Sequence, residues 1–167
     1  MKDEYLALFD DDGNLIPNSY CKRGDALPPH TRLKAACSWI VNARGEFLIT
    51  RRALEKSFQP GIWEAQGGCV SAGEDGLTAA VREAKEESGI DLDPATGELF
   101  SEERFGDMFM EHWLFRKEFD LADVVLQEGE TMDARAATWS EIAAMIEDGT
   151  FFKESAEVQN FLGNLFP

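Results

Sequence analysis

The stretch that decides the fold of this 167-residue chain is residues 68–90, GCVSAGEDGLTAAVREAKEESGI. Its second half predicts a helix over 76–88, and Gly89 is typical of the residue that ends a helix. Placed at about 100° per residue, the helix has one apolar flank that faces the core. That flank consists of Leu77, Ala80, Val81 and Ala84.

A second face of the same helix carries Glu83, Glu86 and Glu87, because residues three and four positions apart are neighbours on a helix. Like charges at these spacings cost about 0.2–0.5 kcal/mol per pair, and the negative end of the helix dipole disfavours them further. A solvated surface face would not account for the flanking glycines, Glu74 and Arg82. Divalent cations relieve the repulsion, since carboxylate oxygens are the ligands that Mg²⁺ and Mn²⁺ prefer. The pattern therefore predicts a metal site.

The stretch resembles the Nudix box, Gly-x5-Glu-x7-Arg-Glu-U-x-Glu-Glu-x-Gly-U, in which U is a bulky aliphatic residue. Every fixed position is met, and the one departure is Ala84, which is small for the first U. The resemblance implies an α/β fold, a Nudix-type α/β/α sandwich with a mixed β-sheet and the box as loop–helix–loop. It also implies a hydrolase that cleaves a diphosphate linkage in a nucleoside diphosphate derivative.

The resemblance assigns roles to individual box residues, with Mg²⁺ or Mn²⁺ as the cofactor. Glu83 serves as a metal ligand or as the base, and Glu74 pairs with Arg82 to hold the loop against the helix. The metal ligands that it implies are the main-chain carbonyl of Gly68 and the carboxylates of Glu83, Glu86 and Glu87.

Three residues are candidates for the general base that deprotonates the attacking water. Glu130 precedes a predicted late strand, Glu111 lies on an apolar strand, and Glu83 lies within the box. His112, next to Glu111, is more typical of a packed strand residue than of a catalyst.

Candidate substrate contacts lie on the segment before the box. Arg51, Arg52 and Lys56 are cations that could meet phosphate oxygens, although the end of a strand often carries solvated cations. Trp63 and Phe58 could stack on a base, and core packing explains them equally well.

Composition limits the partners. Sixteen Lys and Arg against 32 Asp and Glu give a formal charge of −16, which disfavours nucleic acid and anionic membranes as partners. No run of about 18 apolar residues is present, and because the chain opens with acidic residues and no apolar run follows, we expect no leader. The three cysteines, Cys21, Cys37 and Cys69, suit a reducing compartment. We expect one cytoplasmic Nudix domain over residues 1–167 that acts on a small-molecule nucleotide or another diphosphate, with a homodimer left open.

The remaining elements follow from apolar runs and turn residues. Strands are expected over 5–9, 35–41, 46–51, 63–66, 98–105, 109–119 and 128–138. Helices are expected over 140–147, with Ser140 as the N-cap, and within 151–166.

The wider chain resembles the bacterial Nudix hydrolases labelled isopentenyl-diphosphate-isomerase-like. This likeness rests on Glu4-Tyr5-Leu6, Arg23-Gly24-Asp25 and Leu126–Glu130. An isomerase is the first alternative function, but Gly68 stands at the position of its cysteine acid and Cys69 comes one residue late. A non-catalytic nucleotide sensor is the second, and the intact box argues against it. The group attached to the diphosphate is not specified, with nucleoside di- or triphosphates favoured.

Overall fold

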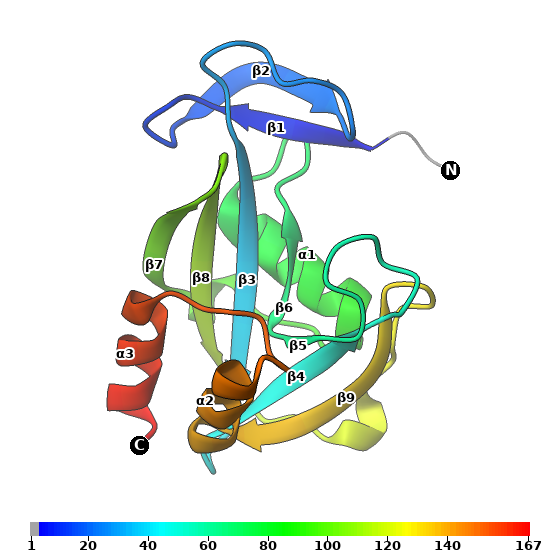
Figure 1. The fold of residues 1–167 in the computed structure, drawn as a ribbon, viewed down its shortest axis with the longest axis vertical. Helices are drawn as coiled ribbons and strands as arrows, with labels where there is room; N and C mark the ends of the chain where they lie inside the picture. Colours follow the sequence, from blue (N-terminus) through cyan, green and yellow to red (C-terminus); the bar gives the residue numbers. More distant parts are fainter. Residues whose placement is uncertain (1–3) are drawn as a thin grey trace.

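The computed structural model describes residues 4–167 as a seven-stranded mixed sheet, a separate two-stranded hairpin and three α-helices (Figure 1). The hairpin is β1 (Tyr5–Phe9) and β2 (Leu15–Lys22). The sheet contains β3 (Leu33–Val41), β4 (Glu46–Arg52), β5 (Trp63–Glu64), β6 (Gln66–Cys69), β7 (Glu98–Phe105), β8 (Met108–Arg116) and β9 (Thr131–Thr138). The helices are α1 (Gly76–Ser88), α2 (Trp139–Asp148) and α3 (Ala156–Leu165). Within residues 4–167, no helix is long and apolar enough to cross a membrane.

Strand β3 organises the sheet. It pairs in parallel with β8 along its whole length, from Leu33 opposite Met108 to Val41 opposite Arg116. Its other edge is divided between two antiparallel partners, β6 along the first half and β4 along the second. Strand β9 pairs with β4, and β7 pairs with β8.

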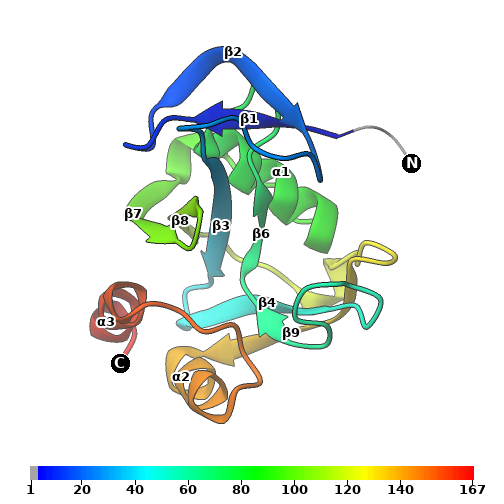
Figure 2. The same ribbon diagram turned by 45° about the horizontal axis from the view of Figure 1, so that its top comes forward.

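Different helices pack against the two faces of the sheet. Ala36 and Ile40 of β3 belong to the apolar cluster under α1, whereas Trp39 and Val41 belong to the cluster under α2 and α3. Side chains alternate between the faces of a strand, so one apolar run serves both clusters. Figures 1 and 2 show α1 set apart from α2 and α3. The predicted α/β/α sandwich is confirmed.

Helix α1 has the predicted bounds because both of its ends are capped. The Asp75 side chain accepts a hydrogen bond from the Thr78 N–H at 2.8 Å, and Gly89 adopts the left-handed conformation with φ 75°. The Ser38 hydroxyl donates to the Ala80 carbonyl at 2.8 Å and fastens the helix to β3.

The predicted strands over 5–9 and 98–105 have the observed bounds, and the other five differ. Strand β3 begins at Leu33, β4 ends at Arg52, and β9 begins at Thr131 rather than at residue 128. The expected strand over 63–66 is two short strands, and β6 continues through Gly67 and Gly68 to Cys69. The glycines fit there because a Cβ on Gly67 would lie 2.7 Å from the Ala36 carbonyl oxygen. Strand β8 ends at Arg116 rather than at residue 119.

The first of the two C-terminal helices was predicted with the wrong N-cap, and the second lies within the predicted span of residues 151–166. Thr138, and not Ser140, is the N-cap of α2, since Thr138 and Glu141 form a capping box. Helix α3 begins at Ala156, because Phe151 is an extended residue that bridges to Trp63 and is buried in the core.

Candidate active site

The box residues line an open polar cavity of about 630 Å³, here called the acid cavity. It gathers side chains from the box, the hairpin, the segment after β4 and the segment before β9. Among its lining residues are Arg23, Arg52, Lys56, Gly67, Gly68, Cys69, Glu74, Arg82, Glu83, Glu86, Glu87, Gln127 and Glu130.

The glycines before the helix let its carboxylates approach the backbone of β6. The Gly67 N–H donates to Glu87 Oε2 at 3.1 Å. A Cβ on Gly68 would lie 2.3 Å from Glu83 Oε1, so only glycine leaves that carboxylate its place. The main chain of β6 and the acid face of α1 therefore meet directly.

Burial makes this cluster of acids electrostatically costly. Glu87 is 5% exposed, and its burial raises its pKa well above the usual value, with the charges of Glu64 and Glu83 adding to the shift. Burial likewise raises the pKa of Glu83, while neighbouring Arg82 opposes that shift. Such carboxylates favour a cation beside them.

Arg82 links the box loop to the helix. Its guanidinium donates to Glu74 at 2.7 and 3.1 Å and to the Cys69 carbonyl at 3.0 Å. It also donates to Glu83 at 2.7 Å and to Glu86 at 3.2 Å. Arg82 thus partly neutralises the acid face, and Glu74 holds Arg82 from the loop side.

The donor set at this place fits a hard divalent cation. Glu83, Glu86 and Glu87 offer only oxygen atoms, and Gly68 is a tight cradle that a Cβ would fill. Glu83 and Glu86 share the single guanidinium of Arg82 with Glu74, and Glu87 makes no ion pair with it, which leaves negative charge for a metal ion to balance.

The structure brings one of the two distal base candidates to the box. Glu130 borders the acid cavity and forms an ion pair with Lys56. Glu111 lies instead beneath the start of α1, where it accepts hydrogen bonds from Lys34 and Trp113, each at 2.9 Å. His112, the next residue, faces the opposite side of the sheet.

The five candidate substrate contacts lie in different parts of the structure. Arg52 borders the acid cavity, where it donates to both carboxylate oxygens of Glu64 at 2.8 and 3.0 Å. Arg51 and Trp63 line a different hollow beside Gly149 and Thr150. Of the five, Arg52 and Lys56 border the acid cavity, and Phe58 lines a neighbouring one.

Beside the acid cavity lies a second one of about 520 Å³, here called the apolar cavity, which sequence reasoning missed. The two cavities share Arg52, Gly67 and Gly68. Its walls include Leu27, Leu33, Phe58, Phe105, Met108, Met110 and Phe152. These residues come from widely separated segments, so no local pattern could reveal the cavity.

The hairpin also contributes to the acid cavity. Arg23 reaches it from the end of β2 and donates to Glu4 at 2.8 Å. The sequence marks Arg23 only through its resemblance to a subgroup, without a role.

Comparisons with known proteins agree with this architecture. The NUDIX domain model matches residues 31–158. An uncharacterized Nudix hydrolase of Listeria monocytogenes is 32% identical over 130 residues, which is 77% of each chain. An isopentenyl-diphosphate Delta-isomerase of Escherichia coli is 34% identical over 96 residues, 56% of this chain and 52% of that protein.

Among solved structures, DR0079 from Deinococcus radiodurans superposes with a TM-score of 0.74 at 20% identity, and the match covers 98% of this chain and 100% of that one. The likeness extends over the hairpin that precedes the matched domain. On its sequence match and its box geometry, the chain belongs to the Nudix hydrolase family.

Proposed function

We propose that this Nudix hydrolase cleaves the diphosphate linkage of a nucleoside di- or triphosphate, or of a nucleotide-linked compound, with Mg²⁺ or Mn²⁺ as the cofactor. The observation that carries the proposal is the acid cavity, which is lined by the carboxylates of Glu83, Glu86 and Glu87 together with Gly68, Arg52 and Glu130. The adjoining apolar cavity offers space for the group attached to the diphosphate.

The cation would be held by Glu83, Glu86, Glu87 and the carbonyl of Gly68. When bound, it neutralises charge on the diphosphate and lowers the pKa of water. Arg82 orients Glu83 and Glu86 through its hydrogen bonds to both.

The other residues act on the substrate and on the proton. Arg52 and Lys56 border the cavity and supply positive charge to phosphate oxygens. Glu130, which forms an ion pair with Lys56, takes the proton of the attacking water as general base. Glu83 is the base if Glu130 is not.

A substrate panel tests the proposal. Nucleoside di- and triphosphates, sugar nucleotides and dinucleoside polyphosphates are each incubated with Mg²⁺ or Mn²⁺, and the products are resolved. We expect release of a nucleoside mono- or diphosphate from at least one substrate class, and none in EDTA. If the wild-type protein turns over substrate no faster than the Glu87→Gln protein, the proposal is contradicted and a non-catalytic sensor is favoured.

The isomerase relative gives one observation in favour of a second function. The isomerase reaction has little support in the site itself. Cys69 lines the acid cavity, but His30 lies on the surface, where it bonds to Asp11. Incubation with isopentenyl diphosphate, followed by analysis for dimethylallyl diphosphate, decides between the two reactions. We expect no isomer.

We further propose that the enzyme works as one domain in the cytoplasm on free small molecules. The three cysteines form no disulfide among residues 4–167, which suits a reducing compartment.

A further inference from the structure

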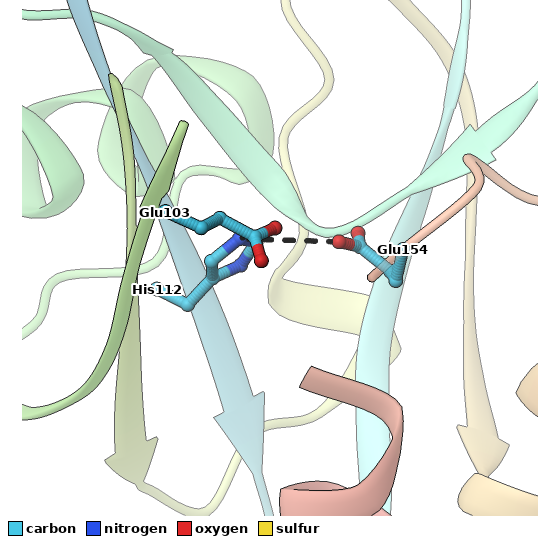
Figure 3. Close-up of side chains that lie close together, drawn as sticks. All are labelled: Glu103, His112 and Glu154. Carbon is cyan, nitrogen blue, oxygen red and sulfur yellow. Dashed lines mark ion pairs between the residues drawn. The ribbon is translucent and has the colours of Figure 1, made fainter. Parts of the chain in front are cut away.

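The titratable residues Glu103, His112 and Glu154 lie close together, as Figure 3 shows, and Glu154 lines the apolar cavity. Glu103 comes from β7, His112 from β8, and Glu154 from the segment between α2 and α3. His112 Nε2 lies 3.4 Å from Glu103 Oε1 and 4.0 Å from Glu154 Oε2. The spacing resembles that of a metal site.

The tautomer of His112 argues against a metal ion there. The Trp39 indole N–H donates to His112 Nδ1 at 3.2 Å, so Nδ1 is the acceptor and the proton of the neutral ring sits on Nε2. A protonated ring nitrogen has no lone pair for a metal. Burial lowers the pKa of His112, which keeps the ring neutral. The cluster therefore presents an N–H group to its two carboxyl groups.

Glu154 is the member of the cluster that borders the apolar cavity. Glu154 is 5% exposed, and its carboxyl group makes no hydrogen bond with any side chain or main-chain group of residues 4–167. Burial raises the pKa of Glu154 to about 8, and the charges of Glu103 and Glu64 add to the shift. At pH 7 this neutral acid offers one donor and one acceptor, and at 4.0 Å His112 Nε2 lies beyond hydrogen-bond distance, so neither has a hydrogen-bond partner among residues 4–167.

The surroundings of Glu154 select the kind of group that would pair with it. The cavity wall carries aromatic rings and thioethers, from Phe58, Phe105, Phe152, Met108 and Met110. Flat rings pack well on such walls. A ring with a neighbouring donor and acceptor on its edge satisfies the carboxyl group, whereas an alkyl group leaves it buried and unpaired.

We propose that Glu154 is a specificity-determining residue, whose carboxyl group hydrogen-bonds the edge of a nucleobase held in the apolar cavity. The inference rests on the proposed function, because the cavities share Arg52, Gly67 and Gly68 and one nucleotide can occupy both. Its diphosphate then lies over the box and its base beside Glu154.

Binding without phosphates tests the inference apart from catalysis. Adenosine, guanosine, cytidine, uridine and ribose are titrated in EDTA into the wild-type protein and three variants, with binding followed by NMR. Glu154→Gln keeps a donor and an acceptor, and Glu154→Leu removes both. Glu103→Gln is the matched control, since Glu103 belongs to the cluster but does not border the cavity.

We expect the wild-type, Glu154→Gln and Glu103→Gln proteins to bind at least one nucleoside more tightly than ribose. Glu154→Leu should lose roughly tenfold of that preference, the size of one or two neutral hydrogen bonds. Equal binding of nucleosides and ribose by the wild type overturns the inference, as does full preference in a folded Glu154→Leu protein.

A kinetic ratio separates this inference from the proposed function. The ratio of kcat/KM for the preferred nucleoside diphosphate to that for ribose 5-diphosphate should fall roughly tenfold in Glu154→Leu and stay constant in Glu103→Gln. An equal fall for both substrates indicates a purely structural role and overturns the inference. If the wild type hydrolyses neither substrate but still binds nucleosides more tightly than ribose, only the proposed reaction is contradicted.

Discussion

Glu87 is buried and lies near two other acids. Its negative charge is expected to serve the activity and to lower the stability of the metal-free protein. The charge is costly in the metal-free protein because burial, Glu64 and Glu83 all raise its pKa. Glu87→Gln should therefore stabilise the metal-free protein at pH 7 and lower kcat by orders of magnitude. Melting in EDTA and steady-state rates measure both effects. Glu147→Gln, an exposed acid on α2, is the control, and wild-type activity in the Glu87→Gln enzyme would refute the assignment.

The two distal acids predict contrasting kinetics. Glu130 borders the acid cavity, whereas Glu111 is held by Lys34 and Trp113 beneath α1. Glu130→Gln should lower kcat by orders of magnitude with little change in KM, because the loss is confined to the transition state. Glu111→Gln should destabilise the fold and leave the kcat of the folded enzyme nearly unchanged. If neither variant changes kcat, Glu83 is the base.

Glu154 predicts a pH dependence of stability. Its pKa is about 8 in the folded protein against an ordinary value of 4.5, so folding takes up a proton at pH values between the two. The free energy of unfolding falls as pH rises through this window, by at most about 1.4 kcal/mol per pH unit. Glu154→Gln lacks this loss, and its stability relative to wild type should rise between pH 5 and 8. A constant difference in urea unfolding across that range would contradict the shift.

At the scale of elements, helix α1 is the part of the fold that the sequence predicts best. Its bounds coincide with prediction because helical periodicity and a glycine that ends the helix are local signals. The acid face follows from helical periodicity alone. Strand β6 was missed in part because glycines are poor strand formers, and they are needed there by Ala36 and Glu83. The apolar cavity has no local signal.

The N-cap of α1 should contribute measurably to stability. Asp75→Ala removes the acceptor for the Thr78 N–H and should lower the free energy of unfolding by about 1 kcal/mol. Urea unfolding measures this loss. Asp75→Asn retains an acceptor and should recover most of it. A loss as large in the asparagine variant would mean that charge, rather than the hydrogen bond, is responsible.

For the whole molecule, a charge of −16 with a buried acid cluster predicts stabilisation by cations. A metal that binds only the folded state stabilises it by RT ln(1 + [L]/Kd), about 2.7 kcal/mol at a concentration of 100 Kd. The melting temperature should rise by several degrees from EDTA to millimolar Mg²⁺ or Mn²⁺. Glu87→Gln should reduce the rise. Equal melting temperatures of the wild type in both conditions would contradict a metal site.

The parallel pairing of β3 with β8 has a consequence for how the chain is made. During synthesis, β3, β6 and α1 leave the ribosome before β8, and the segments bearing Glu130 and Glu154 follow later still. Pairings between distant segments are slow to form. We therefore expect a nascent chain to bring β6 and the acid face of α1 together first. Glu130, the proposed base, and Glu154, in the wall of the apolar cavity, should take their places last. Newly made protein should acquire affinity for cations before it acquires turnover.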